Sequence, residues 1–163
     1  MARPPPPVHC AAIPFVLEEG HGPAMARREE GGDPERVFTL FEANSTIPQL
    51  VEHLAAVKRG KGVLVDTMAE IKKASAKASF GGGSYAGRPY LAALEQISQH
   101  LHAIHEIGVL VKDVDMGLCD FPHSANGRVV HLCWKLGETE INWWHDVHSG
   151  YTGRQPLECL DNG

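Results

Sequence analysis

The sequence lacks the local signatures of several protein classes. Its four cysteines form no Cys-x-x-Cys pair, which argues against a zinc knuckle and against a thioredoxin-like redox motif. It has no apolar run of about 18 residues, so we expect no transmembrane helix and no membrane partner. It also lacks a Gly-x-Ser-x-Gly motif and a phosphate-binding glycine loop. The sequence therefore carries no catalytic signature with a known mechanism.

Positive charge is scarce, and its distribution is uneven. The net charge is −5 at pH 7. Residues 46–91 contain seven Lys and Arg against three Asp and Glu, whereas residues 106–161 contain four against nine. The two ends could pair head to tail between subunits or could simply be solvated faces. Because no aromatic residues are interleaved with the basic ones, we do not expect nucleic acid as a partner.

Residues 1–35 have the composition of a disordered tail. A proline run at Pro4–Pro7 and a Gly-Gly-Asp-Pro stretch near the end accompany a lack of apolar periodicity. The segment does not have the charge pattern of a targeting peptide, and we predict a cytoplasmic protein. Residues 36–163 are long enough to form a single domain with its own core.

The first half of this domain, residues 36–107, has the periodicity of helices. Thr39 and Glu42 fit a capping box, and apolar residues then recur at heptad spacing. Gly60 and Gly62 each disfavour a helix interior by about 1 kcal/mol, which predicts a bend or break at 59–62.

A triple glycine at 81–83 is predicted to end this helix. Pro89 suits the first turn of a second, shorter helix, and Gly108 supplies its C-terminal stop. The longer helix then has apolar residues that the shorter one cannot cover. We therefore expect a homodimer formed through a four-helix arrangement.

The second half, residues 108–157, has the period of two that is typical of strands. An Asn-Gly turn signal lies within a predicted hairpin. The expected strands are 109–114, 117–121, 128–136 and 140–147, and residues 150–156 are expected to form a loop. The predicted fold class is α+β, an antiparallel helical hairpin packed with a small, mainly antiparallel sheet of three to four strands.

Several separated motifs in the C-terminal half resemble those of one family. They are GLCDFP (117–122), HLCWKLGE (131–138), NWWHD (142–146) and GRQPL (153–157). The segment FTLFEAN (38–44) is similar to the start of the same family. Together they resemble DUF2203, a family of small prokaryotic proteins. The resemblance implies a helical hairpin joined to a small sheet in a soluble bacterial protein, and it implies no particular activity.

A functional site is expected in the last third of the chain. All three tryptophans and seven of the ten histidines lie between His100 and His148. The candidate cluster of titratable residues comprises Asp120, His131, Cys133, Glu138, His145 and Asp146. Asp120, Glu138 and His145 lie in family-matching motifs and are the predicted ligands of a divalent metal ion such as zinc. The alternative is that these residues have structural roles at strand ends, in a turn and in the core.

Two further points concern this cluster: the register of its strands and the character of Cys133. The hairpin loop, taken as residues 124–127, does not fix whether Asp120 shares a face of the sheet with His131 and Cys133. Cys133 lies in mid-strand, where a thiol is usually a small buried apolar group and not a nucleophile.

Three further residues are predicted to bind a ligand. Trp144 would limit access of water to the site. Arg154 and Gln155 would either clamp an anion or pin the terminal loop onto Asp120 or Glu138.

A weaker candidate lies on the second helix, in the sequence HAIHE. His102 and His105 could reach one ion, or His102 could pair with Glu106, because residues three and four apart share a helix face. The simpler interpretation is a polar flank beside the apolar stripe.

The sequence thus predicts a binding or interaction module with a polar pocket where the sheet meets the second helix. The alternative is a metal-dependent enzyme or metal-binding protein that uses Asp120, Glu138 and His145. No reaction can be assigned from the sequence.

Overall fold

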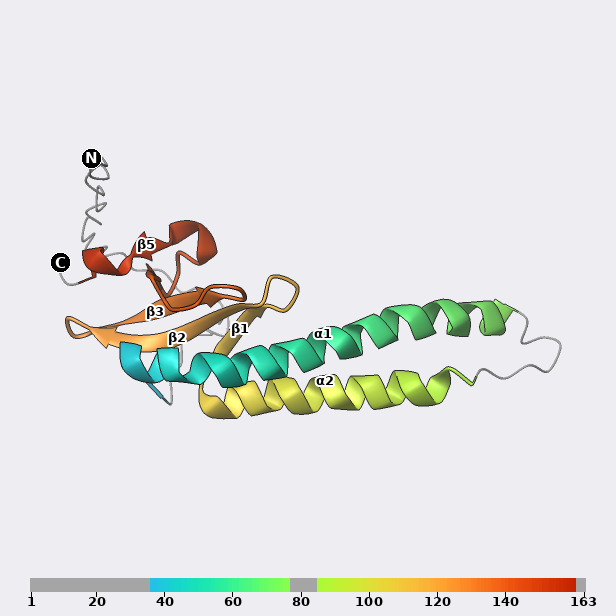
Figure 1. The fold of residues 1–163 in the computed structure, drawn as a ribbon. Helices are drawn as coiled ribbons and strands as arrows, with labels where there is room; N and C mark the ends of the chain where they lie inside the picture. Colours follow the sequence, from blue (N-terminus) through green and yellow to red (C-terminus); the bar gives the residue numbers. More distant parts are fainter. Residues whose placement is uncertain (1–35, 77–84, 161–163) are drawn as a thin grey trace, which may run out of the picture.

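A long helical hairpin carries a small sheet at one end (Figure 1). The computed structural model describes residues 36–76 and 85–160. α1 spans Leu40–Ala76 and α2 spans Gly87–Ile107, which makes them about 55 Å and about 31 Å long at 1.5 Å per residue. The predicted tail and the glycines at 81–83 lie outside the described residues.

The start of α1 is fixed by the predicted capping box. The Thr39 N–H donates to Glu42 Oε2 over 2.8 Å, and the Glu42 N–H donates to Thr39 Oγ1 over 3.2 Å. The bonds from the Thr39 backbone and hydroxyl lower the pKa of the Glu42 carboxyl. The capping prediction is therefore confirmed.

Of the bend or break predicted at 59–62, the break is wrong, because α1 continues through this segment. Gly60 is buried, and a Cβ atom on it would lie 2.7 Å from Ile97 Cγ1 of α2. The glycine lets the two helices approach closely, and the packing gained outweighs its low helix propensity. Gly62 differs, since a Cβ there would meet nothing within 4 Å.

The ends of α2 follow the predicted signals. Pro89 lies in its first turn. Gly108 has a φ of 95°, and its N–H bonds to the carbonyls of Ile104 and His105, as expected for a glycine that ends a helix.

Five strands form one antiparallel sheet, in the order in which they occur along the chain. They are β1 (Leu110–Asp113), β2 (Leu118–Ala125), β3 (Arg128–Lys135), β4 (Trp143–Asp146) and β5 (Gln155–Pro156). The α+β class is confirmed, with one strand more than the three to four predicted. The extra strand, β5, lies in the segment predicted to be a loop. Its two residues are too few to show the alternation by which strands are recognised.

A two-residue turn joins β2 to β3. Asn126 and Gly127 have φ values of 51° and 76°, the two positive values of a type I′ hairpin turn. β2 is therefore longer than the predicted strand, whereas β3 ends one residue earlier than predicted, and Ala125 lies opposite Arg128. This register fixes which residues of β2 and β3 face one another along the whole hairpin.

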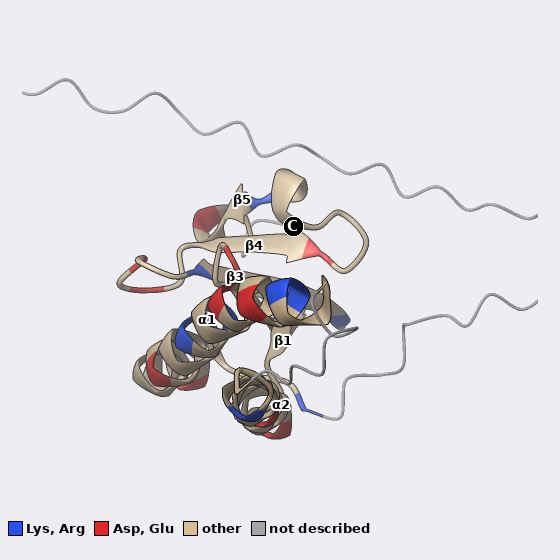
Figure 2. Cartoon of the chain, turned by 90° about the vertical axis from the view of Figure 1, so that its right-hand side faces the viewer, with Lys and Arg blue, Asp and Glu red and all other residues tan. Residues whose placement is uncertain are grey.

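The face of the sheet that points toward α1 carries the hydrophobic core. Val130, Leu132 and Trp134 share this face, and each is fully buried. Leu50 and Leu54 of α1 pack in the same cluster. Figure 2 shows α1 directly beneath the sheet and α2 below α1, farther from the sheet.

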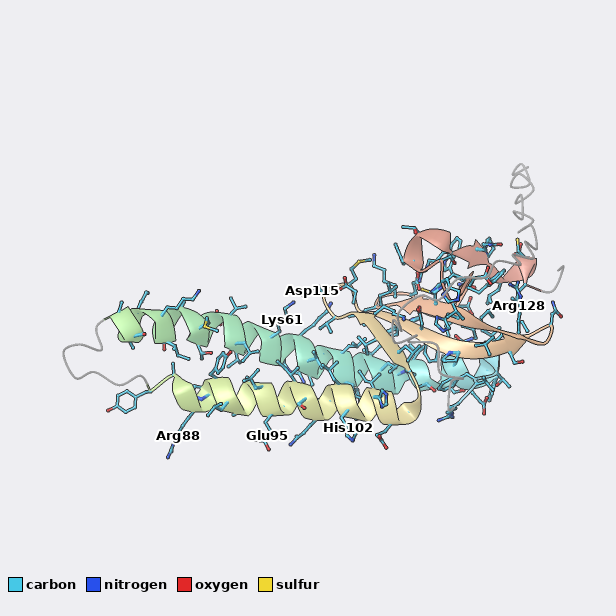
Figure 3. All side chains as sticks on the ribbon, turned by 180° about the vertical axis from the view of Figure 1, so that it is seen from behind. Lys61, Arg88, Glu95, His102, Asp115 and Arg128 are labelled. Atoms are coloured by element: carbon cyan, nitrogen blue, oxygen red, sulfur yellow. The ribbon has the colours of Figure 1, made fainter. Side chains whose placement is uncertain are left out.

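The turn between β1 and β2 is tied to α1. Lys61 of α1 and Asp115 of the turn form an ion pair, and Figure 3 shows them side by side at the edge of the sheet. The Asp113 carboxylate accepts the Met116 N–H within the same turn. These contacts fix the position of the turn against the helical hairpin.

Beyond the sheet, the hairpin has little core of its own. Past Gly60, the described part of α1 has Thr67 as its single buried residue. Apolar side chains exposed on this part of the hairpin include Val63, Val65, Met68, Leu91 and Leu94. No helix among the described residues is long and apolar enough to cross a membrane.

Candidate metal centre

Three adjacent strands bring Asp120, Cys133 and His145 together on the face of the sheet that points away from α1. Asp120 lies directly opposite Cys133 in the β2–β3 register. On the other side of β3, Cys133 pairs with Trp143, two residues before His145 on β4. One carboxylate oxygen, the Cys133 Sγ and one ring nitrogen lie within 4.8 Å of one another, and all three residues are buried.

The orientation of the His145 ring follows from its two contacts. Nδ1 lies 2.7 Å from the Asp146 carbonyl oxygen. A carbonyl only accepts, so Nδ1 must carry a proton and donate. Nε2 then faces Asp120 Oδ2 at 3.1 Å, in the arrangement that metal-binding histidines adopt when the other nitrogen bonds a backbone carbonyl.

The contact between Nε2 and the carboxylate needs a proton or a metal ion between the two atoms. Without one, the lone pair of a neutral imidazole would face a carboxylate and a sulfur in a buried setting, which is unfavourable. Either a second proton on His145 or a bound metal ion satisfies the three atoms.

In the metal-free protein, the second proton explains the charge states of the pair. Burial by itself lowers the pKa of His145, but hydrogen bonds to Asp120 and Cys133 outweigh it and raise the pKa to about 10. Burial alone would raise the pKa of Asp120, whereas its contacts with His131 and His145 hold it well below its usual range. The metal-free site is therefore an ion pair.

Two buried atoms at this site lack a hydrogen-bond partner. Among the described residues, the buried side-chain atoms without a hydrogen-bond partner are Asp120 Oδ1 and His131 Nδ1. His131 Nδ1 lies 3.4 Å from Asp120 Oδ2, which is long for a hydrogen bond. Buried polar atoms are normally paired, so the site has unused capacity for a ligand.

Arg154 covers the cysteine from the C-terminal segment. Its Nε donates to Cys133 Sγ over 3.2 Å. Its two terminal nitrogens bond the two oxygens of Glu138 at 3.0 Å and 3.2 Å. Arg154 thus joins Cys133 of β3 to Glu138 in the segment that follows it.

A pocket of about 360 Å³ leads to the site. Asp120 and His145 line it, whereas Cys133 is fully buried behind them. The other lining residues are Lys112, Asp113, Met116, Leu118, Val147, Gly150 and Tyr151. A second hollow of about 540 Å³ lies where β1 meets α2 and is lined mainly by apolar residues.

A family model described as an uncharacterized conserved protein, DUF2203, matches residues 36–157, which is more than half of the 163 residues. The chain belongs to the DUF2203 family. The match covers α1, α2, the sheet and the candidate metal centre. Comparison with curated proteins and with solved structures finds no match.

In this DUF2203 chain, two of the three predicted metal ligands lie together. Asp120 and His145 are in direct contact. The carboxylate of Glu138 is bonded to Arg154 and accepts the Lys135 N–H at 2.7 Å. The cluster of three donor atoms contains Cys133 in its place.

The three residues that were predicted to bind a ligand have different surroundings in the structure. Trp144 is buried in the core on the α1 side of the sheet and donates to the Pro156 carbonyl. Gln155 pairs with it on β5. Arg154 bonds Glu138, one of the two carboxylates that were predicted to hold the terminal loop in place. The neighbouring Trp143 lies near Arg154, and its ring centre is 5.9 Å from the guanidinium carbon.

The weaker candidate on α2 is a surface feature of the DUF2203 chain. His102 and Glu106 are 3.7 Å apart, and their side chains are 73% and 67% exposed. Figure 3 shows His102 on the side of α2 that points away from the sheet. Such an exposed pair contributes little to stability.

Cys133 belongs to the site, although the sequence pattern did not place it among the predicted metal ligands. A thiol in mid-strand is usually inert, and Cys119 fits that description, since burial raises its pKa to about 12. Cys133 differs through Arg154, 21 residues away. The Asn-Gly turn was the available signal, because a two-residue turn between Ala125 and Arg128 places Asp120 opposite Cys133.

Proposed function

We propose that this protein binds a divalent transition metal ion, zinc in the first place, through Asp120, Cys133 and His145. One observation carries the proposal. Three buried donor atoms of different chemistry converge within 4.8 Å. Thiolate, imidazole and carboxylate are the three ligand types that zinc takes in proteins.

The spacing of the donor atoms supports an ion of this size. Ligand bonds of about 2.0–2.3 Å in a tetrahedral site place ligand atoms about 3.3–3.6 Å apart. His145 Nε2 and Asp120 Oδ2 are 3.1 Å apart, and the longest separation in the cluster is at most 4.8 Å. Side-chain shifts of about an ångström would complete the site.

The surrounding residues have the roles that outer-shell groups play in metal sites. His145 is held by the Asp146 carbonyl, and Arg154 donates to Cys133 Sγ. Glu138 acts on the site through Arg154 and not as a ligand in this proposal. Such partners fix ligand orientation and affect metal affinity by about 10–100-fold.

A nucleophilic role for Cys133 is a less suitable function for the same geometry. The residue is fully buried and does not line the pocket, so a substrate there would meet Asp120 and His145 first. Nucleophilic catalysis requires the thiolate to reach the substrate.

The test is zinc titration of metal-free protein, followed by calorimetry, with a matched pair of cysteine variants. Cys119 and Cys133 are both free and buried, but Cys119 belongs to the core on the α1 side. Cys133→Ala should abolish stoichiometric binding, and Cys119→Ala should retain it. Equal binding by both variants, with circular dichroism showing both folded, would exclude the proposed ligand set.

We further propose that the chain forms a homodimer through the distal part of the hairpin. Val65 and Leu91 are each 65% exposed there, and two hairpins could bury these side chains in a four-helix arrangement. Light scattering at micromolar concentration is expected to give the dimer mass. A monomer mass would exclude this assembly.

The compartment and partners that fit this proposal are those of a bacterial cytoplasmic protein. Cys133 must stay reduced to bind a metal, a condition that the cytoplasm maintains. Nucleic acid is not a partner in this proposal, because the chain is acidic overall, with a net charge of −5. The pocket beside Asp120 and His145 instead has the size to admit a small molecule.

A further inference from the structure

The proposed metal site is accessible from one side. Asp120 and His145 form part of the pocket wall, and Cys133 lies behind them. An ion held by the three residues would therefore have its fourth coordination position toward the pocket. Zinc sites with three protein ligands and an open position bind water or a substrate, whereas structural sites are closed by a fourth protein ligand.

His131 is the residue that would close the site instead. Its Nδ1 is buried, unpaired and 3.4 Å from Asp120 Oδ2. However, the residue does not line the pocket. A small shift would bring it within hydrogen-bond distance of the carboxylate, where it would hold a ligating aspartate as outer-shell residues do.

The pocket supplies one cationic side chain suited to binding an anion. Lys112 of β1 lines both this pocket and the neighbouring hollow beside α2, and among the described residues no ion pair includes Lys112. The acidic neighbour in the wall, Asp113, is held by the Met116 N–H. A divalent ion with one carboxylate and one thiolate ligand is neutral, and the Asp113 carboxylate offsets the charge of Lys112. The pocket is then neutral overall, with Lys112 as the cationic side chain in its lining.

We propose that the open position of this metal centre binds a small oxyanion, a carboxylate or phosphate group, with one oxygen on the metal and another on Lys112. This inference rests on the proposed metal function. The apolar side chains of Met116, Leu118 and Val147 line the same pocket and would contact the rest of the molecule. Bidentate recognition of this kind combines a metal bond with a charge-assisted hydrogen bond.

The experiment uses the full chain loaded with cobalt(II), which reports on its ligands by visible absorption. Acetate and inorganic phosphate are titrated separately into the wild-type protein, into Lys112→Met and into Lys72→Met. Lys72 is an exposed lysine of α1 outside the pocket, so its variant is the matched control. A thiolate-to-cobalt band in every sample shows that the metal is bound through Cys133.

The expected result is a saturable change of the cobalt spectrum with at least one anion. Lys112→Met should weaken its binding by about tenfold to hundredfold, the effect of losing one hydrogen bond to a charged group. Lys72→Met should bind as the wild type does. The anion that binds more tightly identifies whether the natural ligand carries a carboxylate or a phosphate.

Two results would overturn the inference while leaving the metal function intact. A cobalt-thiolate spectrum that responds to neither anion indicates a closed site. Equal anion binding by wild type and Lys112→Met removes the role of the lysine. Absence of the thiolate band in the wild type would instead contradict the metal function itself, and the inference with it.

A His131→Gln variant separates the open site from the closed one. If the site is open, this variant keeps the cobalt-thiolate band and still responds to the anion. If His131 is the fourth ligand, the band shifts strongly or disappears in the variant.

Discussion

His145 Nε2 lies 3.1 Å from Asp120 Oδ2, although the two residues are on strands β4 and β2, which are separated by β3. Cys133 lies on the strand between them, and its Sγ is within 4.8 Å of a carboxylate oxygen of Asp120 and a ring nitrogen of His145. Removing the charge of Asp120 should therefore affect both metal binding and folding.

Asp120→Asn is expected to abolish zinc binding and to lower the free energy of unfolding of the metal-free protein by about 1–3 kcal/mol, since it leaves a buried partner unsatisfied. Urea denaturation measures the second effect. Asp146→Asn is the control, because its side chain is partly exposed and pairs with Arg128. That variant should change stability by about 1 kcal/mol or less, and an equal loss in both variants would contradict the role given to Asp120.

The stability of the metal-free protein should depend on pH through the same pair. The pKa of His145 is raised from 6.5 to about 10, so its contribution is fully present below pH 6.5 and is lost as pH rises toward 10. The pKa of Asp120 is lowered from 3.8, so its contribution is present above pH 3.8 and is lost as pH falls.

Urea denaturation at a series of pH values should therefore show a maximum between pH 3.8 and 6.5 for the pair's contribution, obtained by subtracting the profile of His145→Gln. With zinc bound, the metal replaces the second proton, and the loss of stability on the alkaline side of this window should disappear. A pH profile for metal-free wild type that parallels the His145→Gln profile would contradict the ion pair.

Gly60 and Gly62 provide a matched test of the helix packing. Gly60→Ala places a Cβ 2.7 Å from Ile97 Cγ1 and should lower stability by about 1–3 kcal/mol, the usual effect of overpacking. Gly62→Ala meets no neighbour within 4 Å and should raise stability by up to about 1 kcal/mol through helix propensity. Thermal melting of both variants checks this, and a stabilised Gly60→Ala would show that the helices are not held in close contact there.

Arg154 is expected to set the properties of the Cys133 thiolate. Arg154→Met removes the hydrogen bond to Sγ and should weaken zinc binding by about 10–100-fold. It should also shift the thiolate-to-cobalt band, because the sulfur then donates more charge to the metal. Arg128→Met, which removes a guanidinium paired with Asp146, should change neither property.

Much of the fold could be predicted because its signals are local. The capping box at Thr39, the stop at Gly108 and the Asn126-Gly127 turn each act within a few residues, and each appears in the structure. Gly60 misled the prediction, since its role depends on Ile97 of the other helix. A contact between two helices does not change the spacing of apolar residues within either helix, so the sequence pattern does not reveal it.

The candidate site could be predicted in part for the same reason. The cluster of histidines, tryptophans and acidic residues marks the region, and Asp120 and His145 do lie together. Which donors share a face depends on register, and the two-residue turn decides it by placing Asp120 opposite Cys133. The pairing of Glu138 with Arg154 depends on how the terminal segment folds back, which no local pattern indicates.

The most direct test of the metal centre is X-ray absorption at the zinc edge on untagged protein purified without chelator. We predict about one zinc per chain, with one sulfur at about 2.3 Å and nitrogen or oxygen ligands at about 2.0–2.2 Å. Cys133→Ala should remove the sulfur signal, and Cys119→Ala should not. A wild-type protein without stoichiometric metal, or with zinc bound by nitrogen and oxygen alone, would contradict the proposed metal centre.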